Sequence, residues 1–182
     1  MELFLLLLLV VPVVAAALLY NSLVRKRNAV DFAFSCIDAQ LKKRFDLIPN
    51  LVNTVKGYAQ HESGVLREMT ELRANLSGTR AESKKRFDIE SQITQKLPSI
   101  FAIAENYPDL KASQNFLNLQ QNLSEIEAQI SAARRAFSAA VYEYNNAVKT
   151  LPSNIVAGMF GFQERAFFEI GEAERSTPAV SF

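Results

Sequence analysis

The sequence contains no tryptophan, one cysteine and one histidine, and little glycine or proline. A single cysteine excludes an intramolecular disulfide, and a free cysteine among apolar residues is usually a small core residue, which we expect of Cys36. Six glycines and six prolines in 182 residues, together with many Leu, Ala, Glu, Gln and Lys residues, favour long helices over sheets.

Neither sign of charge is in excess. The 20 basic and 19 acidic residues give a formal net charge of +1. Proteins that bind nucleic acid neutralise many phosphates, so this balance gives no reason to expect nucleic acid as a partner. Three basic runs, Lys42–Arg44, Lys84–Arg86 and Arg134–Arg135, are typical of solvated helix faces. If several of them met near a bilayer, they could instead hold anionic lipid headgroups.

The side chains that catalysis requires do not form a recognisable pattern. His61 has no second histidine or cysteine at ligand spacing, so a zinc site would have to be built from carboxylates. Cys36 and His61 alone do not make a catalytic arrangement, and no Gly-x-Ser-x-Gly motif occurs. Glu125 and Glu127 lie two positions apart and would face different directions on a helix. We therefore expect no enzyme activity, no cofactor and no metal site.

The longest apolar run lies at the N-terminus. Leu3 to Leu19 contains no charged or strongly polar side chain. Extended to Val24, the run would span roughly 33 Å as a helix, which matches a hydrocarbon core about 30 Å thick. Pro12 is compatible with this assignment because membrane helices tolerate proline. We predict that residues 1–24 form the anchor of a single-pass membrane protein.

The alternative for this run is a cleaved signal peptide, in which Ala15–Ala17 would imitate a cleavage site. Signal peptides carry positive charge before the apolar stretch, whereas here Glu2 precedes it and Arg25, Lys26 and Arg27 follow it. This asymmetry favours an uncleaved anchor. Because positive residues stay in the cytoplasm, it also predicts an N-terminus outside and a cytoplasmic helical domain.

Beyond the anchor, apolar residues recur every three or four positions and predict a first amphipathic helix. The positions on its apolar face are Val30, Phe34, Ile37, Leu41, Phe45, Ile48, Val52, Val55, Ala59, Val65, Met69 and Leu72. The pattern keeps its phase across Pro49, which predicts a kink rather than a break. We expect irregularity near Tyr20–Ser22 and Gly57–Gly64, and a turn at Asn75–Gly78.

A second helix is predicted to begin near Ala81 or Ser83 and to end at Asn106–Asp109, with a candidate bend at Pro98. Pro108 can open the next helix. The apolar face of the second helix comprises Phe87, Ile89 or Glu90, Ile93, Leu97, Ile100 and Ala104.

The third helix carries a seven-residue repeat. One row is Phe116, Leu123, Ile130, Phe137, Tyr144 and Leu151, and a second row is Leu119, Ile126, Ala133 and Ala140. This is an a/d heptad seam roughly 54 Å long, which predicts close packing against a neighbouring helix. Polar residues beside the seam, such as Asn145, are expected to form interhelical hydrogen bonds. We predict an all-α fold: an N-terminal transmembrane helix and then an antiparallel bundle of long coiled-coil-like helices, over residues 25–170.

After Pro152, which can open a short helix, the sequence becomes rich in aromatic residues. Met159, Phe160, Phe162, Phe167 and Phe168 provide more apolar surface than a short helix buries alone. They are candidate contacts with the bundle itself, with another subunit or with lipid. The last stretch, residues 171–182, is polar and is expected to be a flexible tail.

Blocks of sequence spread along the chain are recognisable together. The most specific is Asp46-Leu47-Ile48-Pro49-Asn50-Leu51-Val52. Others are Ile37-Asp38-Ala39-Gln40-Leu41-Lys42, Thr54-Val55-Lys56-Gly57-Tyr58-Ala59, Tyr107-Pro108-Asp109-Leu110-Lys111-Ala112, Tyr144-Asn145 and Pro152-Ser153-Asn154. From the anchor to about Phe168, the chain resembles the LemA family of bacterial membrane-anchored helical proteins. Ser138 and Gln129 depart from the family pattern and would change polar contacts in the bundle.

The resemblance implies one N-terminal helix in the bacterial inner membrane, a long helical bundle and no established enzyme activity. Our leading hypothesis is a membrane-anchored structural or interaction protein. Its helical domain would form a homo-oligomer or recruit a membrane protein partner. One alternative is a lipid-organising or membrane-shaping protein. Another is an accessory binding subunit of a membrane protease or signalling complex.

Overall fold

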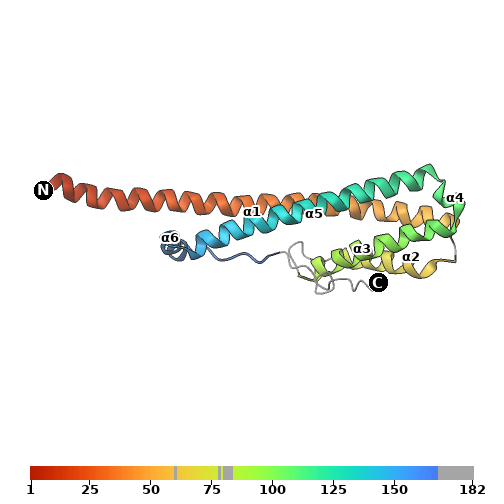
Figure 1. The fold of residues 1–182 in the computed structure, drawn as a ribbon. Coiled ribbons are helices and arrows are strands. Elements are labelled where there is room, and N and C mark those ends of the chain that lie inside the picture. The colour runs from red at the N-terminus through yellow and green to blue at the C-terminus, as the bar shows by residue number, and fades with distance from the viewer. Residues whose placement is uncertain (60, 78, 80–83, 168–182) are drawn as a thin grey trace, which may run out of the picture. The chain divides into compact units, whose positions relative to one another are not determined.

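The computed structural model describes residues 1–59, 61–77, 79 and 84–167, and every regular element in these ranges is helical (Figure 1). The elements are α1 (Glu2–Tyr58), α2 (Ser63–Leu76), α3 (Lys84–Ile103), the 3-10 turn η1 (Ala104–Asn106), α4 (Pro108–Lys111), α5 (Gln114–Lys149) and α6 (Ser153–Phe160). The all-α class and the antiparallel bundle of helices are confirmed.

The chain divides into two compact units, and α1 and α5 each contribute to both. Unit 1 contains residues 1–36 and 133–167, and the described part of unit 2 is residues 37–132 with the gaps given above. Each unit has its own core, so each is described by itself.

In unit 2, four helical segments pack around one apolar core. Its segments are the later part of α1, α2, α3 and the early part of α5, with α4 and η1 at the turn that leads into α5. Helices α2 and α3 lie side by side, as Figure 1 shows. The most deeply buried side chains are Ile48, Leu51, Val55, Met69, Ile93, Leu97, Ile100, Leu110, Phe116 and Leu123. Most of these residues lie on the apolar faces that the periodicity predicts.

The predicted first helix is two helices in the structure. Helix α1 ends at Tyr58, and α2 begins at Ser63. The break falls in the interval Gly57–Gly64, where irregularity is predicted, because two glycines lower helix propensity within one short stretch. Helix α1 is otherwise continuous through Pro49 and through Tyr20–Ser22. The irregularity predicted near Tyr20 is therefore wrong: one polar pair does not break a helix whose backbone bonds stay intact.

In the later helices, the prolines lie at the kinds of position that the sequence predicts. Pro98 lies inside α3, and Pro108 occupies the first turn of α4. The start predicted near Ala81 or Ser83 lies outside the described residues. Helix α5 follows the heptad seam but ends at Lys149, so Leu151 lies beyond it and is 75 % exposed rather than part of the seam.

In unit 1, the early part of α1 packs against the later part of α5 and against α6. Val30, Ala33, Val141 and Tyr144 are buried there. The rings of Phe34 and Phe137 meet edge to face, with their centroids 6.0 Å apart. Cys36 is exposed, which corrects the expectation of a core cysteine. It lies off the apolar face defined by Val30 and Ala33, so its position relative to the helix phase decides its exposure.

Candidate functional site

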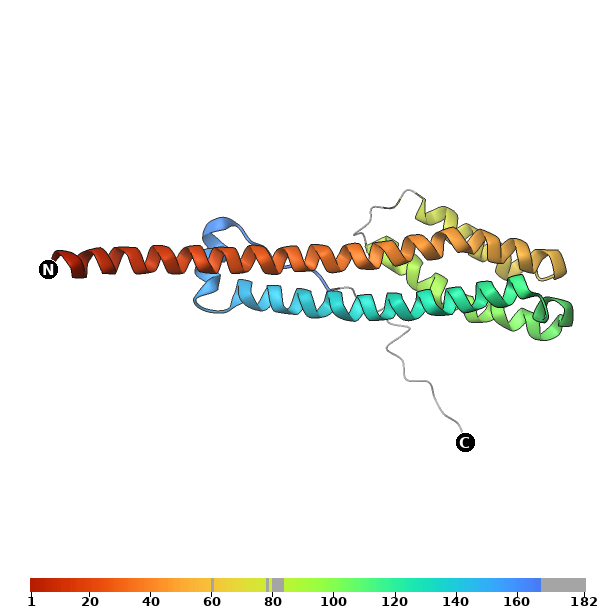
Figure 2. The ribbon, with the colours of Figure 1, turned by 90° about the horizontal axis from the view of Figure 1, so that it is seen from above.

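The first part of α1 is an apolar helix that its own unit leaves uncovered. Leu9 is 70 % exposed, and Val13 and Leu18 are each 62 % exposed. Figures 1 and 2 show no other described element of unit 1 beside the N-terminal turns of α1. Among the described residues, α1 is the one helix long and apolar enough to cross a membrane. Soluble proteins rarely expose an apolar surface of this length.

The basic residues Arg25, Lys26 and Arg27 follow this surface directly. Arg25 is exposed. The Lys26 ammonium lies 3.0 Å from a carboxylate oxygen of Glu143 on α5. The Arg27 guanidinium lies over the ring of Phe162, 5.4 Å from its centroid, in a cation–π arrangement. Two of the three basic residues therefore also contribute contacts within unit 1.

Helix α6 packs against the end of the apolar part of α1. Leu23 is fully buried against Val156 and Ala157, and Ala16 and Leu19 pack around them. The ring of Tyr20 lies 4.8 Å from that of Phe160, measured between centroids. Helix α6 ends at Phe160 and is capped by Gly161, whose φ of 69° is a left-handed conformation that favours glycine.

The outer side of α6, together with Leu151 just before the helix, carries a row of large exposed apolar side chains. Leu151, Ile155 and Met159 follow one another at intervals of four and are 75 %, 58 % and 76 % exposed. Phe160 beside them is 60 % exposed. We call these four residues the α6 apolar row.

Two side chains of α5 hold the chain that follows α6. The side-chain amide of Asn145 donates a hydrogen bond to the carbonyl oxygen of Arg165 (2.8 Å) and accepts one from the Arg165 backbone N–H (2.9 Å). The Tyr144 hydroxyl donates to the carbonyl oxygen of Gln163 (2.9 Å). The prediction of interhelical hydrogen bonds is therefore wrong for Asn145, because it binds the non-helical segment that follows α6. Burial raises the pKa of Tyr144.

Ion pairs lie next to α6 in the sequence and in space. Lys149, the last residue of α5, lies 2.7 Å from Glu164. Arg165 lies 2.8 Å from Asp31 on α1. With the pair between Lys26 and Glu143, charged groups of α1, α5 and the segment after α6 meet in unit 1.

The aromatic set predicted to contact a partner or lipid does not act as one surface. Met159 and Phe160 lie in the α6 apolar row. Phe162 is half-buried and packs on Tyr20, with the two ring centroids 5.7 Å apart. Phe167 is 47 % exposed, and Phe168 lies outside the described residues, as does the tail of residues 171–182.

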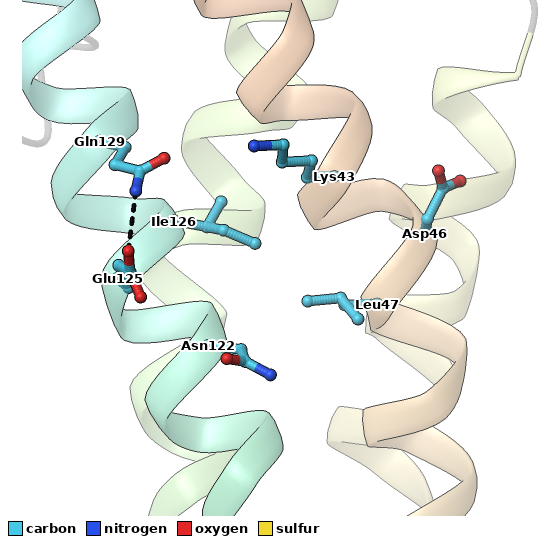
Figure 3. Close-up of a pocket in the computed structure, with 7 residues that line it drawn as sticks. All are labelled: Lys43, Asp46, Leu47, Asn122, Glu125, Ile126 and Gln129. Atoms are coloured by element: carbon cyan, nitrogen blue, oxygen red, sulfur yellow. Dashed lines mark hydrogen bonds between the residues drawn. The ribbon is translucent and has the colours of Figure 1, made fainter.

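Unit 2 has a surface groove of about 410 Å³ between α1 and α5 (Figure 3). Lys43 and Leu47 extend from α1 towards α5, and Asn122 and Ile126 face them. The remaining lining residues are Asp46, Glu125 and Gln129. The lining includes side chains of both positive and negative charge and two apolar side chains. The groove therefore suits a mixed protein surface better than a single charged ligand.

The residues of the specific sequence block have mainly structural positions. Ile48 is buried in the unit 2 core, while Leu47 and Pro49 are half-buried. Asp46 is exposed and lies 2.5 Å from Lys42, and Asn50 is exposed. The block thus contributes one face to the core and one to the solvent.

The second block, Tyr107-Pro108-Asp109, forms the turn that leads into α4. Tyr107 packs against the unit 2 core, and its backbone precedes the helix. Pro108 and Asp109 are exposed in the first turn of α4. Proline suits this position because the first N–H of a helix has no partner within it, and an acidic residue suits the positive end of the helix.

A buried ionic cluster in unit 2 escaped the sequence analysis. Arg44 is fully buried and forms an ion pair with Glu90, which is 2 % exposed. Its guanidinium also lies 2.5 Å from Glu127 on α5 and 2.6 Å from the Thr94 hydroxyl. Arg86 lies 3.7 Å from Glu90, so two basic groups face the two carboxylates.

A signal for Arg44 was present in the sequence. Ile37, Arg44 and Leu51 are spaced by seven and alternate with Leu41 and Ile48, which places Arg44 on the heptad seam. The prediction that Lys42–Arg44 is a solvated basic run did not take this position of Arg44 into account.

The basic runs therefore do not form solvated faces throughout. Arg86, from the second run, is partly buried and lies 2.6 Å from Asp38. Glu125 and Glu127 do point in different directions, as predicted: Glu127 pairs with Arg44, while Glu125 accepts a hydrogen bond from Gln129. Within the described ranges, no group of three or more His, Cys, Asp or Glu side chains is placed to hold a metal ion.

Comparison with known proteins bears on the whole bundle. Residues 33–182 match the LemA family. A relative named Protein LemA, from Metamycoplasma hominis, is 29 % identical over 155 residues, which cover 85 % of this chain and 71 % of that protein. The matched region includes the turn at Tyr107–Asp109 and the ionic cluster described above, and the chain belongs to the LemA family.

Proposed function

We propose that this protein is a membrane-anchored, non-catalytic interaction protein, held in the bilayer by the first part of α1. The observation that carries the proposal is the continuity of α1. Its early part exposes apolar side chains from Leu9 to Leu18, and its later part contributes to the core of a bundle without a break. A soluble role would leave the early part solvated at high cost.

The bundle would lie on the cytoplasmic side of the bacterial inner membrane. The support is the placement of Arg25, Lys26 and Arg27 after the apolar run, because positive residues are retained on that side. The N-terminus would then lie outside.

The interaction role would use surfaces of the bundle to bind a second copy or another membrane protein. Two features support it. Unit 1 exposes Phe32 and Tyr142, at 72 % and 58 %, and unit 2 has the groove lined by Lys43, Asp46 and Leu47. Aromatic side chains of this kind are enriched at protein interfaces. We expect a homo-oligomer.

A second candidate function is the organisation of lipid at the membrane surface. The α6 apolar row favours it, because exposed apolar side chains next to a membrane anchor can enter the bilayer.

The mass of the full-length protein in a mild detergent, beside a form that begins at Asn28, tests the interaction role. A discrete oligomer in both forms would support assembly through the bundle. An oligomer only in the full-length form would assign assembly to the anchor. Monomers in both would contradict self-association and leave recruitment of a different membrane protein.

A further inference from the structure

We propose that α6 is a second membrane element, which inserts the α6 apolar row into the cytoplasmic leaflet beside the anchor. This inference rests on the proposed anchoring by α1. It states that lipid covers the α6 apolar row and at what depth in the bilayer α6 lies.

The depth follows from the contacts between α6 and α1. Helix α6 packs on α1 between Ala16 and Leu23, all before the first basic residue, Arg25. At a rise of 1.5 Å per residue, these contacts lie roughly 3–14 Å from Arg25 along the helix, on the bilayer side. Interfacial helices bury their apolar face about 5–10 Å into the boundary between headgroups and acyl chains. The two ranges overlap, so an anchor that ends at Arg25 brings α6 to the depth of an interfacial helix.

The distribution of charge agrees with this depth. Residues 150–163, which contain α6, include no charged side chain. Charges begin again on both sides, at Lys149 and at Glu164, and these two residues form an ion pair. On α1 the boundary between apolar and charged residues falls at Arg25, and Lys26 reaches Glu143 on α5. The charged residues of α1 and α5 that meet, Lys26 and Glu143, thus lie beyond the apolar part of α1, as expected at a membrane surface.

The structure also fixes the orientation of α6. Val156 and Ala157 face α1, so the opposite side, with Ile155 and Met159, is turned outward. The bonds from Asn145 and Tyr144 to the segment after α6 hold its far end. The row is therefore presented on a fixed element of unit 1.

Lipid fits this row better than a second copy of the chain does. The row has four large side chains, three of them on a helix of eight residues and one, Leu151, two residues before it. A specific protein interface needs about 800 Å² from each partner, which is more than four side chains supply. The row also lies on a helix that packs directly on the apolar part of α1, at Ala16, Leu19 and Leu23.

Depth-dependent fluorescence of the full-length protein in nanodiscs tests the inference. Cys36, the single cysteine, is exposed and would be replaced by serine. An NBD label would then be placed by Met159→Cys in the row, and by Ile155→Cys as a repeat one turn away. Val13→Cys marks the anchor, and Ala136→Cys, an exposed position on α5, marks the aqueous side. The nanodiscs would contain phosphatidylethanolamine and phosphatidylglycerol.

The expected result is a blue-shifted emission at Met159 and Ile155 that nitroxide-labelled lipids quench and aqueous iodide does not. Val13 should behave in the same way, and Ala136 the opposite way. Quenching of Met159 by iodide, with Val13 in lipid, would overturn the role of α6 and leave the anchor intact. Emission at Met159 that neither agent quenches would place protein over the row and also overturn the inference. A water-exposed Val13 would contradict the proposed anchoring itself.

Discussion

The two units of the chain differ in whether they bury or expose their apolar and charged side chains. Unit 2 encloses its apolar residues, and Tyr58 and Leu117 are the large apolar side chains that it leaves exposed among those described. It also buries charge, at Arg44 and Glu90. Unit 1 exposes apolar side chains along α1 and α6 and keeps its ion pairs near the surface. The difference is what we expect if water surrounds unit 2 and lipid meets part of unit 1.

The largest predicted effect concerns the charge buried in unit 2. Arg44→Met would leave Glu90 and Glu127 without their main partner, and breaking a buried ion pair from one side costs about 3–5 kcal/mol. Urea unfolding of the detergent-solubilised protein, followed by circular dichroism, measures the loss.

The control is Lys42→Met, which removes an exposed pair with Asp46 and should cost at most about 0.5 kcal/mol. Combining Arg44→Met with Glu90→Met and Glu127→Met should recover most of the stability, because no unpaired charge then remains buried. Equal effects of Arg44→Met and Lys42→Met would show that the cluster is not a closed part of the core.

The same truncation in the two units sharpens the comparison. Leu51→Ala in unit 2 should cost about 2–5 kcal/mol, because it leaves a cavity in a core that water surrounds. Leu23→Ala in unit 1 should cost less, since lipid chains are as apolar as the side chain that is removed. Local hydrogen exchange in nanodiscs would compare the two. An equal or larger loss at Leu23 would argue that unit 1 folds in water.

A smaller effect is expected where α5 holds the segment after α6. Asn145→Ala removes two hydrogen bonds to the backbone of Arg165, and each such bond contributes about 0.5–1.5 kcal/mol. Amide exchange of residues 163–166 should accelerate, with little change in unit 2. Asn146→Ala is the matched control, because its side chain makes neither of these bonds. Unchanged exchange after Asn145→Ala would mean that packing and the Tyr144 bond to Gln163 hold the segment without Asn145.

The smallest effect is a pH dependence at the surface of unit 2. The pKa of Glu68 lies below its ordinary value of 4.5, because Lys96 on α3 donates a hydrogen bond to it and adds a nearby positive charge. A carboxyl group with a lowered pKa stabilises the fold above its ordinary pKa, and that contribution is lost as the pH falls through the lowered value. The protection of α2 amides, corrected for their intrinsic exchange rates, should therefore fall as the pH drops below the ordinary value of 4.5, and Lys96→Met should flatten the dependence. A dependence that persists in Lys96→Met would assign it to other carboxylates.

Periodicity in the sequence predicts most of the fold because it reports which side of a helix is buried. The seam of α5, with Phe116, Leu123 and Ile130, is found in the core as predicted. The pattern misses Arg44, because a charged residue on a seam looks like a break in the pattern unless its partners are known. Those partners, Glu90 and Glu127, lie far away in the chain.

The candidate site in unit 1 is predicted only in part, for a related reason. The exposure of Met159 and Phe160 agrees with the expectation of an unburied aromatic segment. The contact of α6 with Leu23 and the hydrogen bond from Asn145 to Arg165 form only when the end of the chain folds back on α1 and α5. A local sequence pattern does not contain this information. Cys36 shows the converse, because its apolar neighbours suggest burial while the helix phase exposes it.

Labelling of the native Cys36 tests the central claim, an anchor in the membrane with the bundle in the cytoplasm. Cys36 is exposed and follows Arg25–Arg27 on the side of the bundle. A membrane-impermeant maleimide would be added to bacterial cells with an intact inner membrane, and again after that membrane is permeabilised. The account predicts a membrane-bound protein that is labelled only after permeabilisation. Labelling in cells with an intact inner membrane would place the bundle outside, and recovery of the protein in the soluble fraction would contradict the anchor.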